Sequence, residues 1–293
     1  MHSHDHGHGR AGDRRILAAA LALVVAFAVV EVVGGLLADS LALLADAGHM
    51  LGDAGSLGLA LFAAWIAARP ATAERTYGFR RAEILAALAN GVALVAIAIW
   101  VFVEAADRFR EPPDPLGGWM LAVGGAGLAV NAAVAWMILR GGSRSLNLRA
   151  ALRHVFADLL GSVGVVAAAL VVLATGWAYA DPVASVAIGV LVLASSWAVL
   201  RESVGILLEA SPVDTGEVGR AMVGLPGVVE VHDLHVWTIT SGFPALSAHV
   251  LVDRGADCHA KRLELERVLH DRFGLDHTTL QVEHAQGLLE IHR

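Results

Sequence analysis

The sequence predicts a membrane all-α six-helix bundle followed by a C-terminal cytoplasmic α+β domain. Hydrophobic residues make up 56% of the 293 residues and charged residues only 17%, a composition more apolar than that of soluble proteins. Nearly all long apolar runs lie before residue 209, whereas residues 210–293 carry charges throughout. We therefore expect a transmembrane domain over residues 16–208 and a separate domain over residues 209–293.

The membrane helices are predicted from segment length. A helix needs roughly 20 apolar residues to cross about 30 Å of hydrocarbon, and six segments are long enough. They are residues 16–38, 41–68, 83–106, 116–139, 151–175 and 181–201. Glycines recur along these segments, and small residues let membrane helices approach one another closely. A compact bundle is therefore expected.

Residues 1–15 precede the first span and include His2, His4, His6 and His8 alternating with Ser, Asp and Gly. Such a tract can collect metal ions but cannot pack a core, so we expect a disordered His-rich tail. The apolar run that follows is longer than a signal peptide and lacks an A-x-A cleavage pattern, which indicates a retained membrane helix.

Arginine placement predicts the orientation in the membrane. Arginines fill the connections between the second and third spans and between the fourth and fifth, whereas the opposite connections contain only Arg108 and Arg110, offset by acidic neighbours. Positive loops favour the cytoplasmic side. We expect an integral protein of the cell (inner) membrane with both termini in the cytoplasm.

The C-terminal part alternates between helix and strand patterns. Residues 214–224 and 257–273 read as helices, and residues 228–239, 245–253 and 278–284 read as strands. The order α-β-β-α-β predicts a small two-layer, ferredoxin-like domain. About 80 residues can form an independent core, and dimerisation would stabilise it, so we expect a homodimer.

Composition also narrows the chemistry. The formal net charge of −7 and the absence of a basic stripe argue against nucleic acid as a partner. Because Cys258 is the single cysteine, multi-cysteine zinc sites are excluded, and any metal site must use His, Asp and Glu.

Two four-residue spacings within the apolar spans predict an intramembrane metal site. His49 with Asp53, and His154 with Asp158, would each share one face of a helix. Two such helices side by side offer two imidazoles and two carboxylates, a tetrahedral set that suits a divalent transition metal. Ionisable groups in hydrocarbon are costly, which makes them functional candidates.

The two His/Asp pairs are expected at different depths in the membrane, which argues against a single shared site. His49 and Asp53 lie near the middle of the second expected span, whereas His154 and Asp158 lie in the first turns of the fifth. Helix tilt, or a later start of the fifth helix, would bring the two pairs to one level.

Five motifs in order resemble the cation diffusion facilitator family. They are SLALLADAGHMLGD, YGFRRAEILAALANG, HVFADLLGSVGV, ADPVAS and VHDLHVW. The resemblance implies a dimeric six-span transporter that moves Zn²⁺ and related divalent ions out of the cytoplasm in exchange for protons. It implies that His49, Asp53, His154 and Asp158 form the transport site, and this ligand set is similar to that of zinc-preferring members.

The resemblance also implies a metallochaperone-like C-terminal domain whose zinc ions stabilise the dimer and sense metal. His232 and His249 lie on neighbouring expected strands, where side chains can converge at one edge of the sheet. The ligands that the resemblance implies are His232, His249, His277 and Glu283, with His259 depending on how the helix aligns. In some relatives a pair comparable to Arg81 and Glu209 holds two subunits together; a solvated pair is the alternative.

The expected function is secondary-active export of Zn²⁺, with Cd²⁺ and Co²⁺ as alternatives, by alternating access and in exchange for protons. A metal-gated channel or a membrane metal sensor is the second interpretation. We expect no enzymatic activity, because no H-E-x-x-H motif supports an intramembrane metalloprotease and no Gly-rich nucleotide loop supports ATP-driven pumping. Ligand type alone leaves Zn²⁺, Cd²⁺, Co²⁺, Fe²⁺ and Mn²⁺ open.

Overall fold

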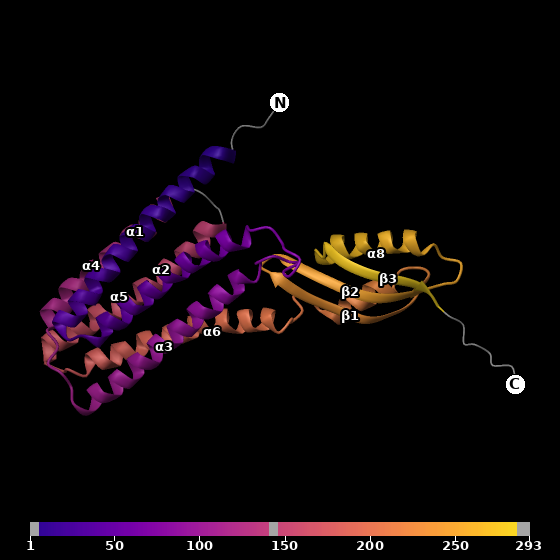
Figure 1. Ribbon diagram of the computed structural model, residues 1–293. Coiled ribbons are helices and arrows are strands. Elements are labelled where there is room, and N and C mark those ends of the chain that lie inside the picture. The colour runs from indigo at the N-terminus through magenta and orange to yellow at the C-terminus, as the bar shows by residue number, and fades with distance from the viewer. Residues whose placement is uncertain (1–5, 141–145, 286–293) are drawn as a thin grey trace. The chain divides into compact units, whose positions relative to one another are not determined.

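The structure is a computed structural model that describes residues 6–140 and 146–285 (Figure 1). Side chains are described except for residues 6–20, 60, 64, 138, 146–154 and 157. The chain divides into two compact units. The first comprises the chain up to Leu59 together with Ala89–Val199, and the second comprises Ala60–Leu88 with the chain from Leu200 onward.

Six long helices form the N-terminal two thirds of the described chain. They are α1 (His6–Ala38), α2 (Leu41–Ala67), α3 (Ala82–Arg110), α4 (Gly117–Arg140), α5 (Leu146–Thr175) and α6 (Ala180–Leu207). All six are long and apolar enough to cross a membrane, which confirms the six predicted spans. Large apolar side chains such as Leu36, Trp65 and Trp197 are exposed on these helices, as expected of surfaces that face lipid. The protein is an integral membrane protein.

Two helices begin earlier than the sequence predicted. α1 begins at His6, ahead of the expected start at residue 16, and an established helix extends by one hydrogen bond per added residue. The disorder of the His-rich tail stays a prediction. His2 and His4 lie outside the described residues.

α5 begins at Leu146, before the expected start at residue 151, so Asp158 lies further along the helix than the sequence predicted. Along the helix axes, Asp158 lies about 18 Å from Leu146 and Asp53 about 21 Å from Ala67, at 1.5 Å per residue. These two helix ends both adjoin arginine-bearing connections. Asp53 and Asp158 therefore lie at comparable distances from these two helix ends.

Glycines allow close approach between the helices of the first unit, as predicted. α4 packs against both α1 and α5. A Cβ atom added to Gly34 of α1 would lie 2.7 Å from Cγ2 of Val123, and one added to Gly124 of α4 would lie 2.7 Å from Cγ1 of Val165. Real Cβ atoms do not approach other atoms so closely, so these contacts require glycine.

The start of α2 is capped by a carboxylate from α6. Asp181 is fully buried; its Oδ1 accepts hydrogen bonds from Ser40 Oγ at 2.6 Å and Ala42 N at 3.2 Å, and its Oδ2 accepts one from Leu41 N at 2.9 Å. Arg108 Nη1 lies 3.5 Å from Asp181 Oδ2. The first backbone N–H groups of a helix lack partners within it, and in lipid they must be satisfied internally. This cap therefore ties together the adjoining ends of α2, α3 and α6.

The C-terminal domain has the predicted α-β-β-α-β order. Its elements are α7 (Thr215–Val223), β1 (Val228–Thr240), β2 (Phe243–Val252), α8 (Cys258–Phe273) and β3 (His277–His284). β2 is the central strand, antiparallel to β1 and parallel to β3. Both helices bury apolar residues against the sheet, including Met222 of α7 and Leu269 of α8, and α8 runs along the sheet in Figure 1. The predicted two-layer fold is confirmed.

Sequence features account for the ends of α8. Asp257 caps its start by accepting hydrogen bonds from the backbone N–H groups of His259 and Ala260, and these bonds lower the pKa of Asp257. Gly274 ends the helix with a left-handed φ of 66°, a conformation that glycine adopts at little cost. Close to this end, a hydrogen bond with Asp276 raises the pKa of His270.

The second unit begins earlier than the predicted boundary at residue 209, because it includes the connection between α2 and α3. Two polar contacts hold this connection against the C-terminal part. Thr240 Oγ1 donates a hydrogen bond of 2.8 Å to Glu83 Oε2, and Arg81 Nη2 donates one of 3.3 Å to Glu209 Oε1.

Candidate metal sites

The first candidate site joins α2 to α5 inside the first unit. His49 Nδ1 lies 3.4 Å from Asp53 Oδ2 one turn along α2, and His49 Nε2 lies 3.5 Å from Asp158 Oδ1 of α5. One potential ligand atom from each of the three residues falls within 4.8 Å of the others. Three of the four residues predicted from the spacing therefore meet. We call these three residues the intramembrane cluster.

Burial makes this cluster chemically unusual. The side chains of His49, Asp53 and Asp158 are 12%, 19% and 4% exposed. Ionised carboxylates in apolar surroundings are costly unless they are paired or bind an ion. Two carboxylates can balance a divalent cation, and imidazole with carboxylate oxygens suits a transition metal.

His154 lies on α5, one turn before Asp158. Four residues along a helix place two side chains on one face. The side chain of His154 lies outside the described residues, so its role as the fourth ligand stays a prediction.

The second candidate site lies on the sheet of the C-terminal domain. His232 of β1 and His249 of β2 are direct cross-strand partners, and their ring centroids are 5.3 Å apart. Asp233 completes a group of three whose ligand atoms lie within 4.8 Å of one another, with His249 Nδ1 4.0 Å from Asp233 Oδ2. We call these three residues the sheet cluster.

Asp233 was not predicted as a site residue. Strict alternation along β1 would direct the side chains of neighbouring residues to opposite faces. The strand register shifts between His232 and His235, and Asp233 adopts a φ of 50°, as in a β-bulge that redirects a side chain. Its position between two histidines in VHDLHVW marks Asp233 as a candidate ligand, but no residue in that motif predicts a bulge.

Among the described residues, the other predicted ligands of this domain do not belong to the sheet cluster. His277 pairs with Ala245 at the opposite end of β2, where its ring contacts those of Tyr77 and Phe243. Glu283 pairs with Leu251 and accepts a hydrogen bond from Gln281. His259 lies in the first turn of α8. The role of these three residues as ligands stays a prediction.

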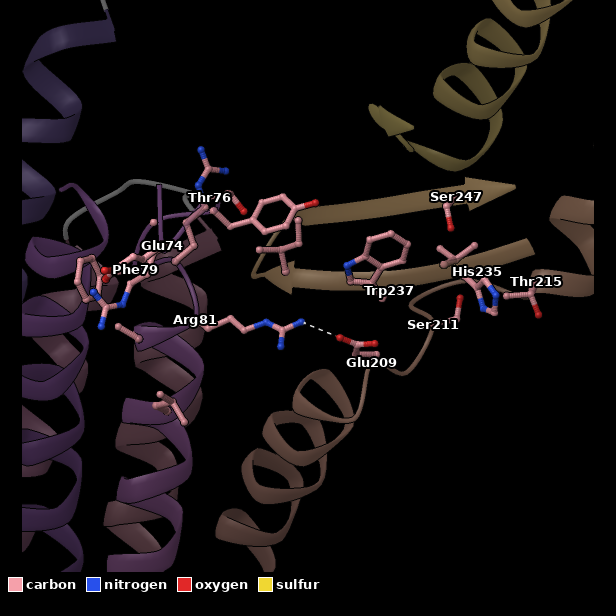
Figure 2. A pocket seen from close by; sticks show the side chains of 18 of the residues that line it. Glu74, Thr76, Phe79, Arg81, Glu209, Ser211, Thr215, His235, Trp237 and Ser247 are labelled. Carbon is pink, nitrogen blue, oxygen red and sulfur yellow. Dashed lines mark hydrogen bonds and ion pairs between the residues drawn. The ribbon is translucent and has the colours of Figure 1, made fainter. Parts of the chain in front are cut away.

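A cavity of about 960 Å³ lies within the second unit, between the connection from Glu74 to Leu85 and the sheet. Figure 2 shows Arg81 extended toward Glu209 at its side. The two side chains are 40% and 63% exposed, and the ion pair joins two parts of one chain. None of the predicted metal ligands lines the cavity, which separates it from both clusters.

Comparison with known proteins agrees with this architecture. The cation efflux transmembrane domain matches residues 17–208, and the cytoplasmic domain of cation efflux proteins matches residues 210–285. Together these matches span both described parts of the chain.

Three curated relatives are similar over nearly their whole length. The cadmium, cobalt and zinc/H⁺-K⁺ antiporter of Bacillus subtilis is 40% identical, over 95% of this chain and 91% of the relative. The metal cation efflux system protein CzcD of Cupriavidus metallidurans is 44% identical, over 97% and 90%. The zinc transporter ZitB of Escherichia coli is 42% identical, over 97% and 92%. With its six apolar helices and its α-β-β-α-β domain, this chain belongs to the cation diffusion facilitator family of metal efflux proteins.

Proposed function

We propose that the protein exports Zn²⁺ from the cytoplasm in exchange for protons, by alternating access. The observation that carries the proposal is the intramembrane cluster, in which an imidazole and two carboxylates from two helices meet inside an apolar bundle. His154, one turn from Asp158, is the proposed fourth ligand. Zinc favours such tetrahedral sets of nitrogen and oxygen ligands.

Protons and metal compete for the same atoms in this cluster. Imidazole binds metal only when it is neutral, and its ordinary pKa near 6.5 lies within the physiological range. Metal loading would therefore release protons on the cytoplasmic side, and protons from the other side would help to expel the metal. Rearrangement of the helices around a fixed site would complete the cycle.

The names of the relatives support the direction and the coupling. They describe a zinc transporter, a metal cation efflux protein and an antiporter of cadmium, cobalt and zinc with protons and potassium. The arginine-bearing connections of α2 to α3 and of α4 to α5 support cytoplasmic termini. We propose a homodimer in the cell (inner) membrane, and we propose that it acts as a transporter without catalysing a reaction.

For the C-terminal domain we propose a cytoplasmic zinc site built on His232 and His249, with Asp233 as an added ligand. His277 and Glu283 stay proposed ligands, as does His259. The match to the cytoplasmic domain of cation efflux proteins supports this proposal.

Transport by the purified full-length protein in proteoliposomes tests the main proposal. Zn²⁺, Cd²⁺, Co²⁺, Fe²⁺ and Mn²⁺ are supplied one at a time, and metal uptake and proton counterflow are recorded with and without an imposed pH gradient. We expect saturable Zn²⁺ uptake that a favourable pH gradient accelerates. Unsaturable flux that ignores the pH gradient would favour a channel, and metal transport with no proton counterflow would refute antiport.

A further inference from the structure

A second group of buried acids lies beside the intramembrane cluster. Glu31 of α1 is fully buried, and neither of its carboxylate oxygens has a hydrogen-bond partner among the described residues. An ionised carboxylate without a partner is unfavourable in such surroundings, and the group takes up a proton or a cation instead. The absence of a hydrogen-bond partner for Glu31 among the described residues therefore indicates that this carboxylate binds a proton or a cation.

Asp46 of α2 is the second acid. It is 1% exposed; its Oδ2 accepts a hydrogen bond of 3.3 Å from Ser162 Oγ of α5, and its Oδ1 has no partner among the described residues. Ser162 Oγ in turn accepts a hydrogen bond of 3.2 Å from Asn131 Nδ2 of α4. Four helices thus direct polar groups toward one buried region.

Two glycines make room for the carboxyl groups. A Cβ atom added to Gly127 of α4 would lie 2.8 Å from Glu31 Oε1, and one added to Gly161 of α5 would lie 2.5 Å from Asp46 Oδ1. Gly127 lies one turn before Asn131, on the same face of α4. α4 therefore lies beside Glu31 at Gly127 and, through Asn131, takes part in the hydrogen-bonded chain that ends at Asp46. The charges of Glu31 and Asp46 also act on each other.

The pair is close to the intramembrane cluster but separate from it. Asp46 lies three residues before His49, a spacing that places two side chains about 5–6 Å apart on one helix face. Asp158 acts electrostatically on both acids, and Asp53 lies further along α2. Around the pair, α4 contributes the uncharged Asn131.

A proton suits this pair better than a metal ion. Within the described residues, Glu31 and Asp46 do not belong to any group of three potential ligands gathered within 4.8 Å. Among the described residues, Asp46 accepts a hydrogen bond from a serine hydroxyl, which in turn accepts one from an asparagine amide. One proton on either carboxyl removes a charge and supplies a hydrogen-bond donor.

We propose that Glu31 and Asp46 hold a proton that leaves when a divalent cation enters the intramembrane cluster and returns when the cation departs. The reaction is the ionisation of one carboxylic acid to carboxylate and a released proton. A doubly positive ion about one helix turn away favours the ionised form. The proposal rests on the proposed antiport and assigns part of its proton coupling to residues that are not metal ligands.

Counting the protons released on zinc binding tests this assignment. ZnCl₂ is added to the full-length protein in detergent, in weak buffer with a pH indicator, and bound zinc is measured in parallel. We expect Glu31→Gln to keep the zinc affinity of the transport site and to release about one proton fewer per zinc bound than the unaltered protein. In proteoliposomes, the same variant loses part of the acceleration that a pH gradient produces.

The matched control is Glu202→Gln, which makes the same change at an exposed position of α6 and is expected to leave the proton count unchanged. Asp46→Asn provides a second measurement if Glu31→Gln does not fold, and Glu31→Asp should restore proton release. An unchanged proton count in both Glu31→Gln and Asp46→Asn would overturn the inference, as would loss of zinc binding at the transport site. If the unaltered protein exchanges no protons for zinc, the proposed antiport itself fails.

Discussion

The intramembrane cluster and the sheet cluster offer similar groups in opposite surroundings. Each combines imidazole with carboxylate oxygens whose ligand atoms lie within 4.8 Å of one another. The intramembrane cluster lies among apolar helices, and its most exposed side chain, Asp53, is 19% exposed. In the sheet cluster, His232, His249 and Asp233 are 40%, 46% and 68% exposed.

Because the two clusters differ in exposure, the proximity of their side chains supports different conclusions about a bound ion. Water can solvate the ionised groups of the sheet cluster, so their proximity alone does not require a ligand. The groups of the intramembrane cluster have little contact with solvent and must be compensated by pairing, by protons or by metal. Substitutions in the two clusters should therefore have unequal effects.

The largest effect is expected from Asp158→Asn. The amide keeps the size of the side chain but removes the negative charge that helps to balance a divalent ion, so zinc uptake into proteoliposomes should fall to the level of empty liposomes. Normal elution of the variant as a folded protein in detergent is the control. Uptake at half the original rate or more would show that the intramembrane cluster is not the transport site.

His232→Ala should have a smaller and different effect. Zinc titration of the full-length protein should show one class of site weakened by about 10-fold or more, while transport per folded molecule stays within a few-fold of the original. His235→Ala, which changes an exposed residue three positions further along β1, is the matched control. Complete loss of transport in His232→Ala would remove the functional distinction between the clusters.

The smallest effect is expected from His270→Ala, which removes a protonatable side chain from the exposed surface. The hydrogen bond with Asp276 raises the pKa of His270 above its ordinary value of 6.5, so this contact stabilises the folded state below pH 6.5 and is lost as the pH rises through the raised value. His270→Ala should lower the unfolding temperature by about 1 °C at pH 6 and leave it unchanged at pH 9. Equal shifts at both pH values would contradict this account.

Much of the architecture follows from local sequence patterns. Apolar runs of sufficient length predicted six helices, and alternating residues such as those of VHDLHVW predicted strands, because helix and strand each impose a period on the side chains. Helix ends were less predictable. Neither the start of α5 at Leu146 nor that of α1 at His6 could be read from hydropathy, because a helix can continue past the apolar segment that places it in the membrane.

The site residues, too, were only partly predictable from the sequence. The four-residue spacing identified His49 with Asp53, and it identified Asp158 as a candidate of a second pair. Asp233 was missed because a bulge with a left-handed residue redirects its side chain. Glu31 could be seen in the sequence, but its burial opposite Gly127 depends on how α1 packs against α4.

By itself, the sequence determined the number of spans, the order of the C-terminal elements and the residue types available for metal binding, since these depend on composition and on short periodic patterns. Only the tertiary structure decided which side chains meet and which are withdrawn from water. Those properties depend on the packing of segments far apart in the chain, as when Asp158 of α5 reaches His49 of α2. The cost of an ionised group is set by its surroundings, and in this protein the surroundings of Glu31 and Asp158 include residues of other helices.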